Sequence, residues 1–243
     1  MKILLTNDDG INGEGIWAMA KALSRRKIFE IVIVAPMHEQ SGMAHALTVG
    51  RKIEYKQIER EGFLAWAIDG TPTDCVKMYL ESMNEGQKIG AVIAGINNGA
   101  NLATDVLYSG TVGAALEGFL HDIPSLAVSL DKNSAITFDD AAEVTAEYFT
   151  SLIENEDLFF HNLNFPKKYF GNFAKFKLSH LGRRDYENAF IHTVEDGKNF
   201  CEIKGTAIDS DASEGTDIFA VNQGFVAVTP LHFDITHHKK ITS

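Results

Sequence analysis

Four polar side chains follow three apolar runs of the chain in a pattern that suits a bound cation. Asp8 and Asp9 come directly after the first run, Ser41 lies a few residues after the second, and Asn97 follows the third. Adjacent carboxylates repel each other, and a divalent cation is the simplest counter-ion for them. Hard cations such as Mg²⁺ take carboxylate, hydroxyl and carbonyl oxygens. The spacing therefore predicts an oxygen-only cation site, although Asp-Asp-Gly is also a good turn sequence and a serine after a strand is often a cap.

A second segment could hold an anion. Ser109, Gly110 and Thr111 stand just before a run of small residues that predicts a helix over 113–120. The first turn of a helix offers free N–H donors and a favourable dipole for a phosphate, and Gly42 is expected to add N–H groups of its own. An ordinary helix cap is the alternative. Metal-assisted phosphoryl chemistry uses both a cation and an anion cradle, so the two segments together favour it.

Two other functions of the first strand end fit less well. Gly10, Gly13 and Gly15 follow the paired aspartates with the spacing GxxGxG, whereas a dinucleotide fingerprint requires GxGxxG. The aspartates would also repel a bare pyrophosphate. A receiver-type phosphorylation module places paired acids here too, but the third strand of this chain ends in Asn97 rather than in a phosphoacceptor aspartate.

The elements that position these residues alternate between strand and helix over the first half of the chain. Short apolar runs separated by helical patterns are typical of a parallel sheet covered on both faces, and right-handed crossovers make such a sheet doubly wound. Strands are expected at 2–6, 31–35, 91–96 and 125–130, and helices at 14–23, 73–83, 113–120 and 139–153. Ligands bind outside the carboxyl ends of such strands, which places the candidate residues on one edge.

The second half of the chain has a different pattern. Short alternating segments at 176–181, 190–194 and 200–204 predict an antiparallel extension, 206–216 reads as a loop, and 225–231 predicts a strand that rejoins the main sheet. We therefore expect an α/β fold with a Rossmann-like, mainly parallel catalytic core over 1–171. A smaller β-rich part, with extension, returning strand and tail, is expected over 172–243.

Composition excludes several classes of protein. The 243 residues carry 22 Lys and Arg against 33 Asp and Glu, a net charge of −11, which argues against a partner such as duplex nucleic acid. The two cysteines are unpatterned, so neither a disulfide framework nor a cysteine-built zinc site is expected. The apolar runs are too short for a signal peptide or a membrane span. We expect a cytoplasmic protein without a membrane partner.

Five segments together resemble the SurE family, the survival protein E nucleotidases and acid phosphatases. They are MKILLTNDDG at 1–10, QSG at 40–42, DGTPTDCV at 69–76, GINNGAN at 95–101 and YSGTVGAA at 108–115. The resemblance implies one divalent cation, Mg²⁺ or Mn²⁺, held by Asp8, Asp9, Ser41 and Asn97. It also implies a 5'-nucleotidase that hydrolyses nucleoside monophosphates, with 3' nucleotides as a further substrate left open. A non-catalytic nucleotide-binding or sensor module of the same fold remains the alternative.

The mechanism that we favour is metal-assisted, in-line hydrolysis, with Asp8 and Asp9 as the catalytic carboxylates. Asp8 is the candidate for orienting or deprotonating the water, and an aspartyl-phosphate on Asp8 is the open alternative. His45 lies close enough to Ser41 in sequence to lie near the site. Either Arg183 or Arg184 could face the substrate, although an exposed hairpin charge is the simpler role for both.

The C-terminal half predicts self-association. Phe190, Ile191 and Phe200 lie in the extension, and Phe233 and Ile235 lie in the terminal segment, with no helix in the sequence to cover them. Large apolar side chains of this kind usually dock on a partner. Symmetric pairing of identical chains is the commonest solution, and the family resemblance agrees. We expect a homodimer or a homotetramer.

Overall fold

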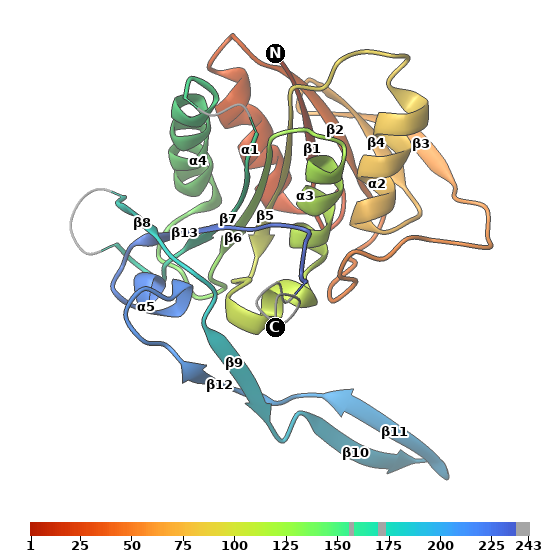
Figure 1. The fold of residues 1–243 in the computed structure, drawn as a ribbon. Helices are drawn as coiled ribbons and strands as arrows, with labels where there is room; N and C mark the ends of the chain where they lie inside the picture. The colour runs from red at the N-terminus through yellow and green to blue at the C-terminus, as the bar shows by residue number, and fades with distance from the viewer. Residues whose placement is uncertain (156–157, 170–173, 237–243) are drawn as a thin grey trace.

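The computed structural model describes residues 1–155, 158–169 and 174–236, and within them the central layer is a nine-stranded sheet (Figure 1). Its strand order is β3-β4-β2-β1-β5-β6-β7-β13-β8. The strands are β1 (Lys2–Thr6), β2 (Glu30–Pro36), β3 (Tyr55–Arg60), β4 (Phe63–Ile68), β5 (Ala91–Asn98), β6 (Ser125–Leu130), β7 (Phe160–Phe165), β8 (Phe176–Leu178) and β13 (Val226–Pro230). All pairs from β4 to β7 are parallel, whereas β3 and β13 run antiparallel to β4 and β7. The predicted doubly wound, mainly parallel sheet is confirmed.

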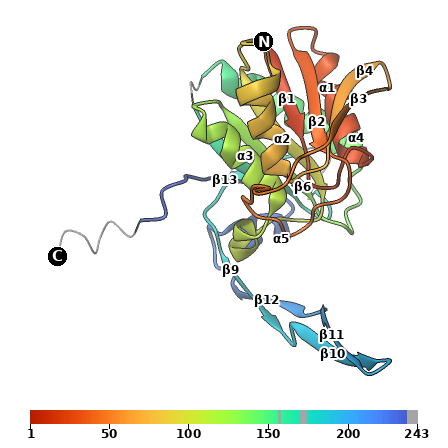
Figure 2. The same ribbon diagram turned by 90° about the vertical axis from the view of Figure 1, so that its right-hand side faces the viewer.

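Helices cover both faces of this sheet (Figures 1 and 2). On one face α1 (Glu14–Ser24) and α4 (Phe138–Ile153) pack side by side in a single hydrophobic core. On the other face α2 (Pro72–Met78) and α3 (Gly110–Leu120) share a second core. A π-helical turn at Tyr79–Met83 continues α2, so the helix predicted over 73–83 is present in two parts. The sheet is thereby buried on both sides, as its apolar strands require.

A glycine sets how closely α1 approaches the carboxyl edge of the sheet. A Cβ on Gly15, in the first turn of α1, would lie only 2.0 Å from the carbonyl oxygen of Ile96 in β5. No other residue type allows this approach, because every other side chain begins with that atom. The glycine spacing that resembles a dinucleotide fingerprint therefore serves helix-to-strand packing beside the candidate site.

An arm of two antiparallel ribbons extends away from this body (Figures 1 and 2). It comprises β9 (Arg183–Glu187), β10 (Phe190–Glu195), β11 (Lys198–Ile203) and β12 (Thr206–Asp211). The predicted loop at 206–216 is wrong over its first six residues, because β12 pairs with β9. Most residues of these strands are exposed, so β12 carries no alternation of apolar and polar residues that could reveal a strand. Asp196 and Gly197, both at positive φ, form the predicted turn between β10 and β11.

Several strands were not predicted from the sequence, namely β3, β4, β7 and β9, whereas β13 rejoins the main sheet as predicted. The expected boundary between 171 and 172 falls within residues 170–173, outside the described residues. The placement of 176–181 in the antiparallel extension is wrong, because β8 pairs in parallel with β13 in the main sheet. The arm at 183–211 leaves the body, as does the described segment after β13 (Figure 2). Within the described residues no helix is both long and apolar enough to cross a membrane.

Candidate functional site

Asp8 lies at the carboxyl end of β1 and is held there by α3. Its side chain is buried, its Oδ1 accepts a hydrogen bond from the Thr111 hydroxyl, and its Oδ2 accepts one from the Thr111 N–H group at 3.2 Å. The close approach of α3 depends on Gly110, where a Cβ would lie 3.2 Å from Asp8 Oδ2. Each carboxylate oxygen keeps a lone pair that can face a cation. Thr111 therefore fixes the orientation of Asp8.

Asp9 is tied to the end of β5, next to Asn97 in the chain. The N–H group of Asn98 donates to Asp9 Oδ2 at 3.0 Å, and Asn97 Nδ2 donates to the carbonyl oxygen of Gly99 at 2.7 Å. Because the amide nitrogen of Asn97 is engaged, its Oδ1 remains as the group that can ligate a cation. The structure thus brings Asp8, Asp9 and Asn97 to one edge, as the sequence predicts.

Ser41 follows Gln40, whose backbone is bonded to Asp8 at the same edge. The N–H group of Gln40 donates to the carbonyl oxygen of Asp8 at 2.8 Å, and the Ser41 hydroxyl donates to Glu39 Oε1 at 2.7 Å. A hydroxyl that gives its proton to a carboxylate keeps its oxygen lone pairs for a metal. Glu39 stands near the end of the second strand, where a dinucleotide fingerprint would place a ribose-binding acid, and its contact with Ser41 was not predicted from the sequence.

Electrostatics at this edge favour a cation. Burial raises the pKa of Asp8 to about 6, the hydrogen bond from Thr111 opposes this rise, and the charge of Asp9 adds to it. Burial likewise raises the pKa of Asp9, and the charge of Glu39 raises it further. Three carboxylates converge on a partly buried edge, a hydroxyl and an amide oxygen lie beside them, and all are hard oxygen donors. The donor set therefore fits Mg²⁺ or Mn²⁺.

The buried charge of Asp8 predicts a pH-dependent gain of stability in Asp8→Asn. The folded pKa of about 6 lies above the ordinary 3.8, so the ionised carboxylate costs the metal-free fold about 3 kcal/mol above pH 6. This cost disappears as the pH falls through 6 toward 4. Without metal, Asp8→Asn is expected to unfold at higher urea concentration than the wild type at pH 7.5, and at pH 4.5 the difference in stability should shrink to about a third. Equal stabilities at both pH values would contradict the assignment.

Two of the residues proposed to bind phosphate also make hydrogen bonds that stabilise the fold. The Ser109 side chain caps α3 by accepting a hydrogen bond from the Val112 N–H group at 3.1 Å. The Thr111 hydroxyl is bonded to Asp8. Gly42 is exposed, at φ +75°, with open space around it. The cap expected as the alternative is therefore present. Because the N–H groups of Thr111 and Val112 are both engaged, the phosphate role of this segment rests on the N–H group of Gly110.

Thr111→Val is expected to lower kcat about tenfold and to change KM little. The substitution removes a hydrogen bond to the Asp8 carboxylate worth about 1.4 kcal/mol, while the helix and its N–H groups persist. Steady-state kinetics with a nucleoside monophosphate test this, and Thr111→Ser, which keeps the hydroxyl, serves as the matched control. A rise in KM at constant kcat would show instead that the hydroxyl binds phosphate in the ground state.

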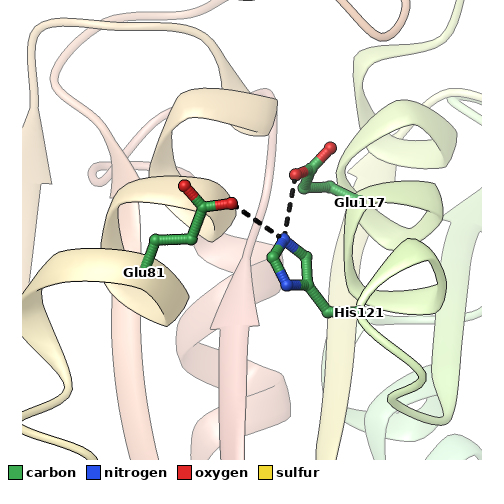
Figure 3. Close-up of side chains that lie close together, drawn as sticks. All are labelled: Glu81, Glu117 and His121. Atoms are coloured by element: carbon green, nitrogen blue, oxygen red, sulfur yellow. Dashed lines mark hydrogen bonds and ion pairs between the residues drawn. The ribbon is translucent and has the colours of Figure 1, made fainter.

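His45 contacts a separate polar cluster between α2 and α3, of which Figure 3 shows Glu81, Glu117 and His121. Its Nε2 lies 2.7 Å from Glu117 Oε2, and Lys77 Nζ lies 3.1 Å from Glu117 Oε1. Burial works against ionisation of Glu117, but the bonds to His45 and Lys77 prevail and lower its pKa to about 2. Glu81, Glu117 and His121 offer ligand atoms within 4.8 Å of one another. Lys77 Nζ also lies 2.6 Å from Glu81 Oε1. The positive charge of Lys77 therefore already pairs with these carboxylates, and a metal ion would have to displace it.

The two arginines occupy different positions on the arm. Arg183 is exposed and pairs with Asp185. Arg184 is mostly buried and bridges Asp209, at 2.7 Å, and Asp105, at 3.0 Å, in the 3₁₀ helix Ala103–Leu107. Burial opposes the charge of Arg184, but both ion pairs outweigh it and raise its pKa. Arg184 therefore anchors the arm to the body, and a substrate-facing role for either arginine stays a prediction.

The fold and this edge define an α/β protein whose candidate site is a cluster of oxygen donors at the carboxyl ends of parallel strands. A family model described as survival protein SurE matches residues 3–188, and the chain belongs to the SurE family. It is 37% identical to the 5'-nucleotidase SurE of Alkaliphilus metalliredigens over 244 residues, which cover 98% of this chain and 95% of that protein. It is 39% identical to the 5'-nucleotidase SurE of Natranaerobius thermophilus over 253 residues, covering 100% and 97%.

The fold has a solved counterpart in the same family. The crystal structure of the SurE protein from Aquifex aeolicus superposes with a TM-score of 0.84 at 34% identity, covering 100% of this chain and 97% of that one. The predicted family, fold and class, a hydrolase of the SurE nucleotidase type, are confirmed. Nothing in these relatives supports the non-catalytic alternative.

Proposed function

We propose that this chain is a metal-dependent phosphomonoesterase that hydrolyses nucleoside monophosphates to nucleoside and phosphate. The observation that carries the proposal is the pair Asp8 and Asp9 at the end of β1, with Asp8 buried and held by Thr111 and with Asn97 at the neighbouring strand end. The relatives from Alkaliphilus metalliredigens and Natranaerobius thermophilus are named 5'-nucleotidases, which supports the choice of substrate.

We assign one Mg²⁺ or Mn²⁺ ion to Asp8, Asp9, Ser41 and Asn97. When bound there, the ion supplies a Lewis acid for a phosphoryl oxygen and lowers the pKa of a bound water. The Asp8 carboxylate, oriented by Thr111, accepts the proton of the attacking water. The N–H groups of Gly42 and Gly110 hold the remaining phosphate oxygens.

Metal removal tests this function directly. Phosphate release from a panel of nucleoside 5'- and 3'-monophosphates is expected to stop in EDTA and to return on addition of Mg²⁺ or Mn²⁺. The panel also identifies the preferred base. Full activity in EDTA would contradict the proposal, and binding of nucleotide without any release of phosphate would favour the sensor module. Incorporation of ³²P into the denatured protein would identify Asp8 as a nucleophile rather than a base.

We further propose that the chain forms a homodimer or homotetramer through the arm. β10 and β11 expose Phe190, Ile191, Val194, Phe200 and Ile203 on a ribbon of only two strands. A ribbon of this size cannot bury such side chains within itself. Light scattering at tens of micromolar is expected to show an oligomer, which Phe190→Asp combined with Phe200→Asp should dissociate. A monomeric wild-type chain would contradict this assembly. The cytoplasmic location stays a prediction.

A further inference from the structure

Lys132 lies beside the candidate cation site, although none of the segments that resemble the family contains it. The register of β5 and β6 pairs Asn98 with Leu130, so Lys132 follows β6 at the level of the turn after β5. A Cβ on Gly99 would lie 3.2 Å from Lys132 Cε and 3.6 Å from Asn97 Nδ2. The stem of Lys132 therefore crosses Gly99, next to the proposed metal ligand Asn97.

The turn that carries Lys132 is held by local hydrogen bonds. The Asn133 N–H group donates to Asp131 Oδ1 at 2.8 Å, and the Ser134 N–H group donates to the carbonyl oxygen of Asp131 at 2.9 Å. The Ser134 hydroxyl donates to the carbonyl oxygen of Pro166 at 2.9 Å. The backbone at Lys132 is thus fixed, which lowers the entropic cost of using its side chain to bind a ligand.

The charge of Lys132 is available to a ligand. Its ammonium group is exposed and, across the described parts of the chain, makes no hydrogen bond or ion pair. Its positive charge acts on Asp9, where it opposes the rise in pKa. Lys132 lines a groove of about 530 Å³ together with Asn98, Trp17 and Arg60. This volume lies in the range of small-molecule sites.

We propose that Lys132 binds the phosphate group of the substrate, and the orthophosphate product, from the side opposite the paired aspartates. This inference rests on the proposed function, since it places a dianionic phosphate between a cation at Asp8 and Asp9 and the ammonium of Lys132. Both positive groups would then face the anion. The leaving alcohol lies toward the groove.

The test compares Lys132→Gln with Lys132→Arg and with Lys88→Gln. Lys88 is an exposed lysine before β5, at the opposite edge of the sheet, so its substitution controls for the loss of one charge. Isothermal titration with inorganic phosphate in saturating Mg²⁺ is expected to show about tenfold weaker binding for Lys132→Gln. Binding should stay within about threefold of the wild type for the other two variants, and KM for a nucleoside monophosphate should rise in parallel.

A second readout separates ligand binding from a structural role. Mn²⁺ affinity, measured by electron paramagnetic resonance without phosphate, is expected to be unchanged or tighter in Lys132→Gln, because a neighbouring positive charge has been removed. Weaker Mn²⁺ binding would show that Lys132 supports the Asn97 turn and would overturn the proposal, as would unchanged phosphate affinity. If the wild type bound Mn²⁺ and phosphate but hydrolysed no nucleotide, the proposed function would fail while this inference stood.

Discussion

Asp9→Asn is expected to lower kcat for a nucleoside monophosphate about a thousandfold, equivalent to about 4 kcal/mol of transition-state stabilisation. Asp9 lies beside Asp8 at the end of β1, and its Oδ2 accepts a hydrogen bond from Asn98, so it joins the ends of two neighbouring strands. An amide in its place removes one negative charge from the cation site while keeping the shape of the side chain. Steady-state kinetics in saturating Mg²⁺ measure the effect.

Asp122→Asn is the matched control for Asp9→Asn. Asp122 is exposed after the end of α3, and its positive φ of 57° is one that asparagine also tolerates. This variant is expected to keep wild-type kcat, and circular dichroism should show that both variants keep their fold. Near-normal activity of Asp9→Asn at saturating metal would remove Asp9 from the site.

Asp217→Ala is expected to lower the free energy of unfolding by about 3–5 kcal/mol, because it leaves buried N–H donors without an acceptor. The Asp217 side chain is fully buried; its Oδ2 accepts from the Ala103 N–H group at 2.7 Å, and its Oδ1 accepts from the Gly182 N–H group at 2.9 Å. These bonds join α5 (Asp217–Asn222) to the segment that leads into Thr111 and to the base of the arm. The melting temperature of the variant should be lower than that of the wild type by on the order of 10 °C.

Asp209→Asn provides the comparison for this stability effect. Asp209 also accepts from a residue at the base of the arm, Arg184, but its side chain is 33% exposed. Exposed ion pairs contribute about 0–1 kcal/mol, so this variant should unfold within a few degrees of the wild type. Similar melting temperatures for Asp217→Ala and the wild type would show that the described hydrogen bonds do not hold the arm to the body.

The sequence was sufficient to predict which side chains lie together at the carboxyl edge of the parallel strands. Asp8, Asp9 and Asn97 follow buried runs, and the ends of parallel strands meet at one edge whatever the details of packing. The bond from Thr111 to Asp8 could not be predicted in this way. That bond depends on how closely α3 approaches β1, which Gly110 permits. In the sequence, the segment 109–111 also fits the pattern of an ordinary helix cap.

Other features depend on register or on pairing that leaves no pattern in the sequence. Lys132 reaches Gly99 only because β5 and β6 pair in one register, and a shift of two residues would move it away. The strand β12 has solvent on both faces, so its polar composition was taken for a loop. His45 lies near Ser41 in sequence, yet its side chain turns to Glu117 on α3.

We propose above all that one divalent cation binds at the carboxyl edge of the sheet. The cluster of Glu81, Glu117 and His121 is the alternative place where a metal ion could bind. Anomalous diffraction from crystals soaked in Mn²⁺ decides between them. The account predicts a single strong anomalous peak within coordination distance, about 2.0–2.2 Å, of oxygen atoms of Asp8, Asp9, Ser41 and Asn97. A peak at Glu117 and His121 in its place, or no peak at the aspartate pair, would contradict it.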